Sequence, residues 1–422
     1  MGRKFYRICL VVMVLFVLFW VGGCAKPASK EESGTTPVEG TNGDIAEKPT
    51  EAPKAVDEGS SSEAVGEAEA TEEKPVVVTE EGIKDVYSEI GLKAGTCLSD
   101  AMVASSRYTD IITKNFNQIT LENYMKPDYI LNKSKSIETG ELTVEFGKNT
   151  IALLDWAKSN DMVVRGHVLV WYSQTPDWIF YQNFNQAEGL VDRDTMLARM
   201  ESYIKQTFQL LQELGYLDIF YAYDIVNEAI MEDGSLRDCL WKQIIGDDYI
   251  WQAFYYADQY APESIKLYYN DYNEQFKTKH IVALAQSLVD DTGRSLIDGI
   301  GCQGHLYTKD SIDLYLLTLK AFSKLGLDVQ ITELDISLGT WQNIEEPSEE
   351  NLKKQGQYYY DLINRIITEN TAGTTKVSGI TFWGFADNLS WRGDRSPLLF
   401  DALLKPKYSY YGAMQDRDNA GF

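Results

Sequence analysis

The feature that most constrains the fold of this chain is a regular alternation of short β-rich runs and longer amphipathic stretches between residues 84 and 422. The β-rich runs predict eight strands, at residues 95–99, 116–120, 162–168, 220–226, 266–270, 298–303, 329–333 and 378–385. Helical patterns lie between them, at 149–158, 197–213, 278–289, 311–325 and 349–369. Strands that alternate with helices pair in parallel through right-handed crossovers, so the chain is predicted to be an α/β protein.

Eight strand–helix units fit a (β/α)8 barrel, the TIM-barrel fold, which typically needs about 250 residues. The additional length would form long loops. An open, doubly wound sheet is the competing architecture for the same pattern. Such sheets commonly carry a Gly-rich phosphate-binding loop after a strand, and we find none in this sequence. We therefore expect the barrel.

The first 23 residues have the pattern of a secretory signal peptide. Basic residues within 3–7 precede an apolar run at 8–21, and Gly22 and Gly23 precede Cys24. This order is typical of a signal peptide, and the run is shorter than the ~20 residues that span a membrane. Gly-Gly-Cys resembles a bacterial lipobox, which predicts a lipid on Cys24 and an anchor in the bacterial cell membrane or outer membrane. An uncleaved signal anchor is the alternative.

Residues 24–83 are predicted to be a disordered acidic tether. Between residues 25 and 81 there is no aromatic residue, and 15 acidic residues stand against five basic ones. Such a segment buries too little apolar surface to offset its ordering entropy. We expect it to hold a catalytic domain, residues 84–422, clear of the membrane.

Charge and cysteine content exclude several classes of function. The net charge of -24 disfavours nucleic acid and polyanionic substrates but leaves neutral polymers possible. Apart from Cys9 of the signal peptide and the lipobox Cys24, the remaining cysteines, Cys97, Cys239 and Cys302, are an odd number without metal-ligand spacing, so we expect buried free thiols, no metal and no cofactor. The nine Trp and 26 Tyr residues fit either a well-packed core or a sugar-binding cleft.

Polar or aromatic side chains stand at the carboxyl ends of most predicted strands. These residues are Glu122, Asn123, His167, Asn227, Glu228, Asn270, Asp271, Gln303, His305, Glu333 and Trp383. In a barrel, the carboxyl ends of the strands form the face that carries active sites. The repeated placement at one end therefore predicts an active site on that face.

Glu228 follows the fourth predicted strand and Glu333 ends the seventh, so the two face each other across the predicted ring. Glycosidic cleavage needs a proton donor for the leaving oxygen and a second carboxylate at the anomeric carbon. Either Glu alone could be structural. As a pair, with Asn227 preceding the first, they are predicted to be the acid/base and the nucleophile of a sugar-cleaving enzyme.

From about residue 91 to 411 the chain resembles glycoside hydrolase family 10, the endo-1,4-β-xylanases. The matching stretches are FNQITLENYMK (116–126), GHVLVWYSQTPDW (166–178), YDIVNEA (223–229), KLYYNDYN (266–273), IDGIGCQGHL (297–306), VQITELDI (329–336) and TFWG (381–384), in the family's order and spacing. The resemblance implies hydrolysis of internal β-1,4-xylosidic bonds of xylan by a retaining double displacement. Glu228 would protonate the leaving oxygen and later activate water, and Glu333 would form the glycosyl-enzyme.

The resemblance also implies roles for residues around this pair. Asn227 would bond the sugar 2-hydroxyl, and a His305–Asp335 pair would orient Glu333, although His305 could instead be a core histidine. The other residues implied to bind substrate are Glu122, Asn123, Lys126, His167, Trp171, Gln174, Gln303, Trp383 and Trp391, with Tyr272 as a supporting residue. Trp156, Trp241 and Trp251 are expected in the core. Tryptophan near the sugar C5 position would leave little room for a hydroxymethyl group, which favours xylan over cellulose.

Two positions depart from the family's pattern. Tyr172 stands where the family usually has His, and Pro127 stands where it usually has Trp. Tyr, with an ordinary pKa near 10, cannot carry protons at neutral pH as His can. Two other functions stay open: a β-glycanase acting on cellulose or mixed-linkage glucan, and a surface lipoprotein that captures xylo-oligosaccharides. The expected partners are xylan, xylo-oligosaccharides and a membrane, not nucleic acid, and a monomer is expected.

Overall fold

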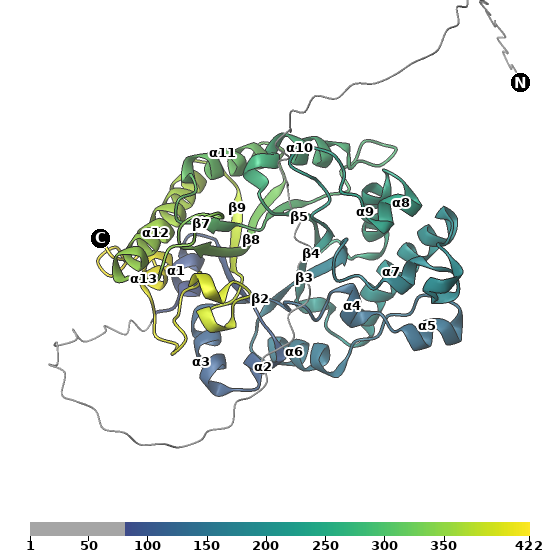
Figure 1. Ribbon diagram of the computed structural model, residues 1–422, viewed down its shortest axis with the longest axis horizontal. Helices are drawn as coiled ribbons and strands as arrows, with labels where there is room; N and C mark the ends of the chain where they lie inside the picture. The colour runs from purple at the N-terminus through teal and green to yellow at the C-terminus, as the bar shows by residue number, and fades with distance from the viewer. Residues whose placement is uncertain (1–80) are drawn as a thin grey trace, which may run out of the picture. The chain divides into compact units, whose positions relative to one another are not determined.

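The computed structural model describes residues 81–422, which fold as a closed barrel of parallel strands with helices around it (Figure 1). The strands are β1 (Lys93–Cys97), β2 (Gln118–Thr120), β3 (Val163–Val170), β4 (Phe220–Asn227), β5 (Lys266–Asp271), β6 (Gly299–Cys302), β7 (His305–Tyr307), β8 (Asp328–Ser337) and β9 (Val377–Phe382). Their order is β6-β5-β4-β3-β2-β1-β9-β8-β7, and a further β6–β8 pairing closes the ring. The predicted barrel is therefore confirmed.

The ninth strand, β7, was not among the predicted strands. It continues β6 after a break at Gln303 and Gly304, so β6 and β7 occupy one position of the barrel and both pair with β8. Gly304 has a φ of +74°, and a Cβ there would lie 2.9 Å from the side chain of Ile331. The break re-aims the chain so that His305 pairs in register with Asp335. The pattern of β-rich residues gave no sign of it.

Helices surround the barrel and cover its outer face (Figure 1). The α-helices are α1 (Ile83–Glu89), α2 (Asp100–Val103), α3 (Ser106–Asn115), α4 (Pro127–Ile130), α5 (Lys133–Thr139), α6 (Lys148–Ser159), α7 (Arg193–Glu213), α8 (Leu240–Ile245), α9 (Tyr249–Tyr260), α10 (Glu274–Ser287), α11 (Ile312–Ser323), α12 (Glu349–Thr371) and α13 (Tyr408–Ala413). Short 3-10 helices are η1 (Asp177–Phe180), η2 (Gln182–Phe184), η3 (Gln186–Glu188), η4 (Leu217–Ile219), η5 (Asp387–Leu389) and η6 (Gly393–Arg395). All five predicted helices are present with shifted ends. For example, α7 begins four residues early because Asp192 caps it by accepting from the Thr195 amide at 2.8 Å.

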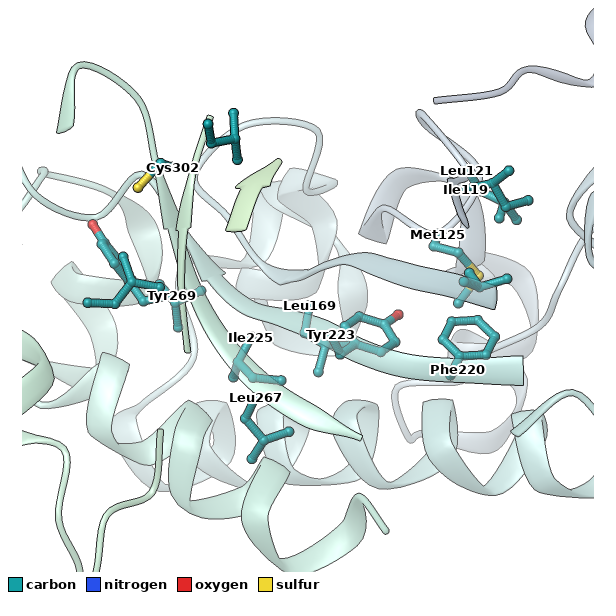
Figure 2. Packing of buried hydrophobic residues seen from close by; sticks show 14 of the residues in the cluster. Ile119, Leu121, Met125, Leu169, Phe220, Tyr223, Ile225, Leu267, Tyr269 and Cys302 are labelled. Atoms are coloured by element: carbon teal, nitrogen blue, oxygen red, sulfur yellow. The ribbon is translucent and has the colours of Figure 1, made fainter. Parts of the chain in front are cut away.

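The apolar core lies between the strands and the helices, because successive side chains of a strand point to opposite faces. Figure 2 shows Ile225 of β4 and Leu267 of β5 in this layer, beside the helices. The barrel interior is polar by contrast, with the Gln118 side-chain amide donating to the Thr381 hydroxyl at 2.6 Å. Of the expected core tryptophans, Trp241 is fully buried. Trp156 and Trp251 are partly buried against the core.

The first helix of the described part lies at the predicted start of the barrel domain. Ile83 opens α1 and is fully buried. The predicted signal peptide, Cys24 and most of the predicted tether lie outside the described residues. Within residues 81–422, no helix is long and apolar enough to cross a membrane. The three cysteines of this part are free thiols, of which Cys97 and Cys302 are buried and Cys239 is partly buried.

Candidate active site

The two predicted catalytic carboxyls lie close together at the carboxyl ends of the strands. Glu228, just after β4, and Glu333, in β8, are only 8% and 5% exposed. The Asn227 amide donates to Glu228 Oε1 at 3.1 Å, and the Asn270 amide donates both to Glu333 Oε1 at 2.8 Å and to Asn227 Oδ1 at 3.0 Å. Gln303 adds a second donor to Glu228 Oε1, at 2.9 Å. Two amide side chains thus bridge the carboxyls.

Charged residues surround Glu333. His305 Nδ1 lies 2.9 Å from Asp335 Oδ2, and its Nε2 lies 3.4 Å from Glu333 Oε2. Asp335 also accepts from Arg392 Nη1 at 2.6 Å and from Trp391 Nε1 at 3.0 Å. The predicted His305–Asp335 contact is therefore present. Trp391 and Arg392, in the loop after β9, fix Asp335 by hydrogen bonds.

This network determines the protonation of its members. Burial lowers the pKa of His305, but the charge of Asp335 and hydrogen bonds to both carboxylates outweigh it and raise that pKa to about 10. Burial raises the pKa of Glu333, whereas the hydrogen bond from His305 and the charges of His167 and His305 bring it below its ordinary value. At neutral pH His305 is an imidazolium and Glu333 a carboxylate, as a nucleophile requires.

The backbone of Glu228 is held in an unusual conformation. Its φ is +55°, in the left-handed region that side-chain-bearing residues rarely adopt. The Glu228 amide donates to the Asn270 carbonyl at 2.9 Å, and its carbonyl accepts from Arg237 Nε at 2.9 Å. The next two amides, of Ala229 and Ile230, both donate to the Tyr269 hydroxyl at 3.1 Å. Four hydrogen bonds therefore fix the turn that presents Glu228.

Tyr172, the first departure from the family's pattern, lies beside Glu228. Burial, and then the charge and hydrogen bonding of Glu228, raise the pKa of Tyr172 well above its ordinary value, so it stays protonated. Its ring lies over the Arg237 guanidinium, 4.2 Å from centroid to carbon. Arg237 Nη2 donates to the Tyr272 hydroxyl at 2.8 Å. Tyr272, predicted as a supporting residue, thus reaches the site through Arg237.

A second cluster lies at the ends of β2 and β3. Lys126 Nζ donates to Asn123 Oδ1 at 2.9 Å and to Gln174 Oε1 at 2.6 Å, and lies 5.0 Å from the centre of the Trp171 ring. Burial lowers the pKa of Lys126, opposed by the charges of Glu333, Glu122 and Glu228. The structure thus joins the predicted sugar-binding residues of this side into one polar group.

The predicted aromatic residues frame the opening. His167, predicted at a strand end, lies inside β3, which continues to Val170; its ring is 5.5 Å edge-on to Trp383 and bonds through Nδ1 to Asp224 Oδ2 at 3.0 Å. Asp224 in turn pairs with the buried Arg165 inside the barrel. Trp391 is half exposed and edge-on to His305 at 5.2 Å. One buried and one exposed tryptophan therefore pack against the two histidines of the site.

Asn270, predicted only as a strand-end residue, links Glu333 to Asn227. Three residues at this site were missing from the predicted set: Asp224 holds His167, Arg392 holds Asp335 and Arg237 holds the Glu228 backbone. Asp224 had a usable signal, because a charge inside an apolar strand needs a partner. Arg237 lies in an irregular loop, where residue patterns carry no such signal. No cluster of metal-ligating side chains occurs in the described part of the chain.

A parallel barrel with two bridged glutamates at the carboxyl ends of opposed strands defines the class of barrel glycoside hydrolases. The sequence model of "Glycosyl hydrolase family 10" matches residues 82–416. The chain belongs to this family.

Several proteins are similar to this chain over its barrel. "Endo-1,4-beta-xylanase B" of Butyrivibrio fibrisolvens is 33% identical over 346 residues, covering 79% of this chain and 53% of the relative. "Bifunctional endo-1,4-beta-xylanase XylA" of Ruminococcus flavefaciens is 38% identical over 341 residues, covering 78% and 33%. A solved structure of the CBM22-1 and GH10 modules of Clostridium thermocellum xylanase 10B with xylohexaose has a TM-score of 0.71 and 34% identity, covering 81% of this chain and 69% of that one. The chain spans about half the length of the first curated relative and a third of the second.

Proposed function

We propose that this protein is an endo-1,4-β-xylanase that hydrolyses internal bonds of xylan with retention of configuration. The observation that carries the proposal is the pair of buried carboxyls in opposite environments. Glu333 faces the His305 imidazolium, which Asp335 holds in an ion pair, whereas the side-chain amides of Asn227 and Gln303 and the Tyr172 hydroxyl bond the Glu228 carboxyl. Family membership and the names of the similar proteins support the same activity.

In the first step, Glu333 attacks the anomeric carbon and the bond to the leaving oxygen breaks. Glu228 gives its proton to that oxygen. Oε1 of Glu228 already accepts two N–H bonds, so the proton is carried by the other oxygen. The His305 imidazolium keeps Glu333 ionised before the attack and stabilises it again as leaving group.

In the second step, Glu228 is a carboxylate and accepts a proton from water. The water oxygen attacks the anomeric carbon from the face that the first sugar left, and Glu333 is released. Two inversions give net retention. Asn227 bonds Glu228 and is linked to Glu333 through Asn270, and we assign it to the 2-hydroxyl of the sugar between the two carboxyls.

We assign the polar group of Asn123, Lys126 and Gln174, with Glu122, Trp171, His167 and Gln303, to binding the xylose units on the non-reducing side. Trp383 and Trp391 would border the sugar at the cleaved bond. Tryptophan near the sugar C5 position would leave little room for the hydroxymethyl group that distinguishes glucose from xylose. This favours xylan over cellulose and mixed-linkage glucan.

The activity is tested by measuring reducing ends released from xylan and from carboxymethylcellulose, side by side, with proton NMR of the first product. The expected result is strong release from xylan, with the β-anomer appearing before mutarotation. Release from cellulose alone would overturn the substrate, and an α-anomer first would overturn retention. Binding of xylo-oligosaccharides without any bond cleavage would favour the capture protein.

We also propose that the protein is a monomer anchored outside the cytoplasm through a lipid on Cys24. The support is the sequence order of a basic segment, a short apolar run and Gly-Gly-Cys. Expression of the full chain in a bacterium should place its activity in the membrane fraction, and mass spectrometry should find a diacylglyceryl group on Cys24. Cys24→Ala should abolish the modification. An unmodified Cys24 in a membrane-bound chain would instead indicate a signal anchor.

A further inference from the structure

The side chain of Arg237 lies next to Glu228 because the chain folds back on itself after β4. Ile230 pairs with Leu236 in an antiparallel bridge, and the Arg237 amide donates to the Ala229 carbonyl at 2.8 Å. Gly234 at the tip has a φ of +89°, and a Cβ there would lie 2.2 Å from the ring of His280. This short hairpin, residues 229–237, therefore has a defined path that returns Arg237 to the acid/base.

Both specific bonds of the Arg237 guanidinium go to neutral oxygens. Nε donates to the Glu228 carbonyl and Nη2 donates to the Tyr272 hydroxyl. The Tyr172 ring covers one face of the guanidinium. The cation thus bonds the backbone of Glu228 and not its carboxyl. Tyr172 and Tyr272 fix the orientation of the guanidinium plane.

The Glu228 backbone needs such a bond. A φ of +55° is costly for a residue with a side chain and persists only where the surroundings hold it. Tyr269, labelled in Figure 2, fixes the next two amides through its hydroxyl, which in turn donates to Asp271 at 2.6 Å. The carbonyl of Glu228 itself accepts its hydrogen bond from Arg237 Nε.

We propose that Arg237 is a positioning residue for proton transfer by Glu228, with Tyr172 and Tyr272 holding its guanidinium in place. The proposal rests on the proposed glycosidase function and deepens it. Without Arg237 the turn relaxes, and the Glu228 carboxyl moves away from the leaving oxygen and from the water. Glu333 and its ion network keep their geometry, since none of their bonds involves the hairpin.

Two substrates separate this role from a general structural one. The sugar that leaves from xylan is a poor leaving group and needs the proton from Glu228. The dinitrophenolate of a dinitrophenyl xylobioside departs without a proton. Arg237→Ala should lower kcat/KM on xylan by about tenfold or more, the effect of one hydrogen bond to a buried group with a charged partner. On the dinitrophenyl substrate the bond-breaking step should change less than about threefold. Azide, which needs no base to attack the glycosyl-enzyme, should raise kcat of the variant and not of the parent.

Matched variants make the result decisive. The control is Arg294→Ala. Arg294 pairs with two carboxylates and lies before β6, at the opposite end of the barrel, so its loss should leave both rates unchanged. Arg237→Lys keeps the charge but loses the fork of the guanidinium, so it should behave like Arg237→Ala. If Arg237→Ala does not fold, Tyr272→Phe, which removes only the hydroxyl, should still reduce xylan turnover selectively.

The outcomes of the two proposals are distinguishable. A parent enzyme without activity on xylan would defeat the proposed function. A parent enzyme active on xylan, with variants that lose equal factors on both substrates or show no response to azide, would defeat the role of Arg237 alone. Unchanged xylan turnover in Arg237→Ala would do the same.

Discussion

The two sides of the active site hold chemically similar carboxyls by opposite means. Around Glu333, an imidazolium, a carboxylate and a guanidinium form a continuous ion network through His305, Asp335 and Arg392. The carboxyl of Glu228 instead accepts from the amides of Asn227 and Gln303, while the nearby cation, Arg237, bonds its backbone. A nucleophile must stay ionised, so a neighbouring cation suits it. An acid/base gains and loses a proton in each turnover. A cation bonded to its carboxyl would favour the ionised form and oppose protonation.

The comparison is tested most severely by removing Glu333. Glu333→Ala should lower kcat on both xylan and a dinitrophenyl xylobioside on the order of 10⁴- to 10⁶-fold, since neither substrate can avoid the nucleophile. Rate measurements on both substrates check this. Glu350→Ala, on an exposed turn of α12, is the control and should retain full activity. Substantial activity of Glu333→Ala on either substrate would contradict the assignment.

Removal of Glu228 should produce a different pattern. Glu228→Ala should cost about 10²- to 10⁴-fold on xylan, the range expected for general acid catalysis, and far less for the first step on the dinitrophenyl substrate. Azide should then accelerate turnover by replacing the water that Glu228 no longer activates. If both substrates slowed equally and azide had no effect, the two carboxyls would not have different roles.

A smaller effect should follow from breaking the ion network. His305→Asn should reduce kcat/KM about 10- to 100-fold, since a hydrogen bond to a charged group is worth about 1.5–3 kcal/mol. Loss of the imidazolium removes the group that holds the pKa of Glu333 below its ordinary value. The acidic limb of the pH–rate profile should therefore move to higher pH. An acidic limb at the same pH in both proteins would show that His305 does not control the nucleophile.

The last expected effect is on stability and not on rate. The folded-state pKa of His305 is raised to about 10, above its ordinary value of about 6.5. Between these values the folded protein holds a proton that the unfolded chain has lost, so this group's contribution is complete below pH ~6.5 and is lost as pH rises through about 10. The Tm of the parent should fall more steeply from pH 7 to pH 10 than that of His305→Asn. Parallel curves would argue against a charged His305.

Much of this fold could be predicted because its signals are local. Strand runs such as 220–226 and helices such as α12 follow from residue periodicity and caps, and their alternation leads to a barrel. The predicted ends of the fourth and seventh strands placed Glu228 and Glu333 on one face, although β8 runs on to Ser337. The break at Gly304 was missed because one glycine, judged alone, does not distinguish a turn from a bend within a strand.

The contacts that tune the site were harder to predict, since they join segments far apart in the chain. Arg392 reaches Asp335 from a loop 57 residues away, and no periodicity links them. Tyr172 was recognised as a departure, but its place over Arg237 depends on the hairpin path after β4. Sequence patterns identify which residues do the chemistry more readily than which residues hold them in place.

The central claim is that Glu333 is the nucleophile and Glu228 is not. It is tested most directly by trapping the first intermediate with a dinitrophenyl 2-deoxy-2-fluoro-xylobioside, followed by peptide mass spectrometry. The fluorine slows both steps, and the good leaving group lets the glycosyl-enzyme accumulate. The account predicts one fluoroxylobiosyl group per protein, on the peptide that contains Glu333. A label on Glu228, or rapid turnover without any covalent adduct, would contradict it.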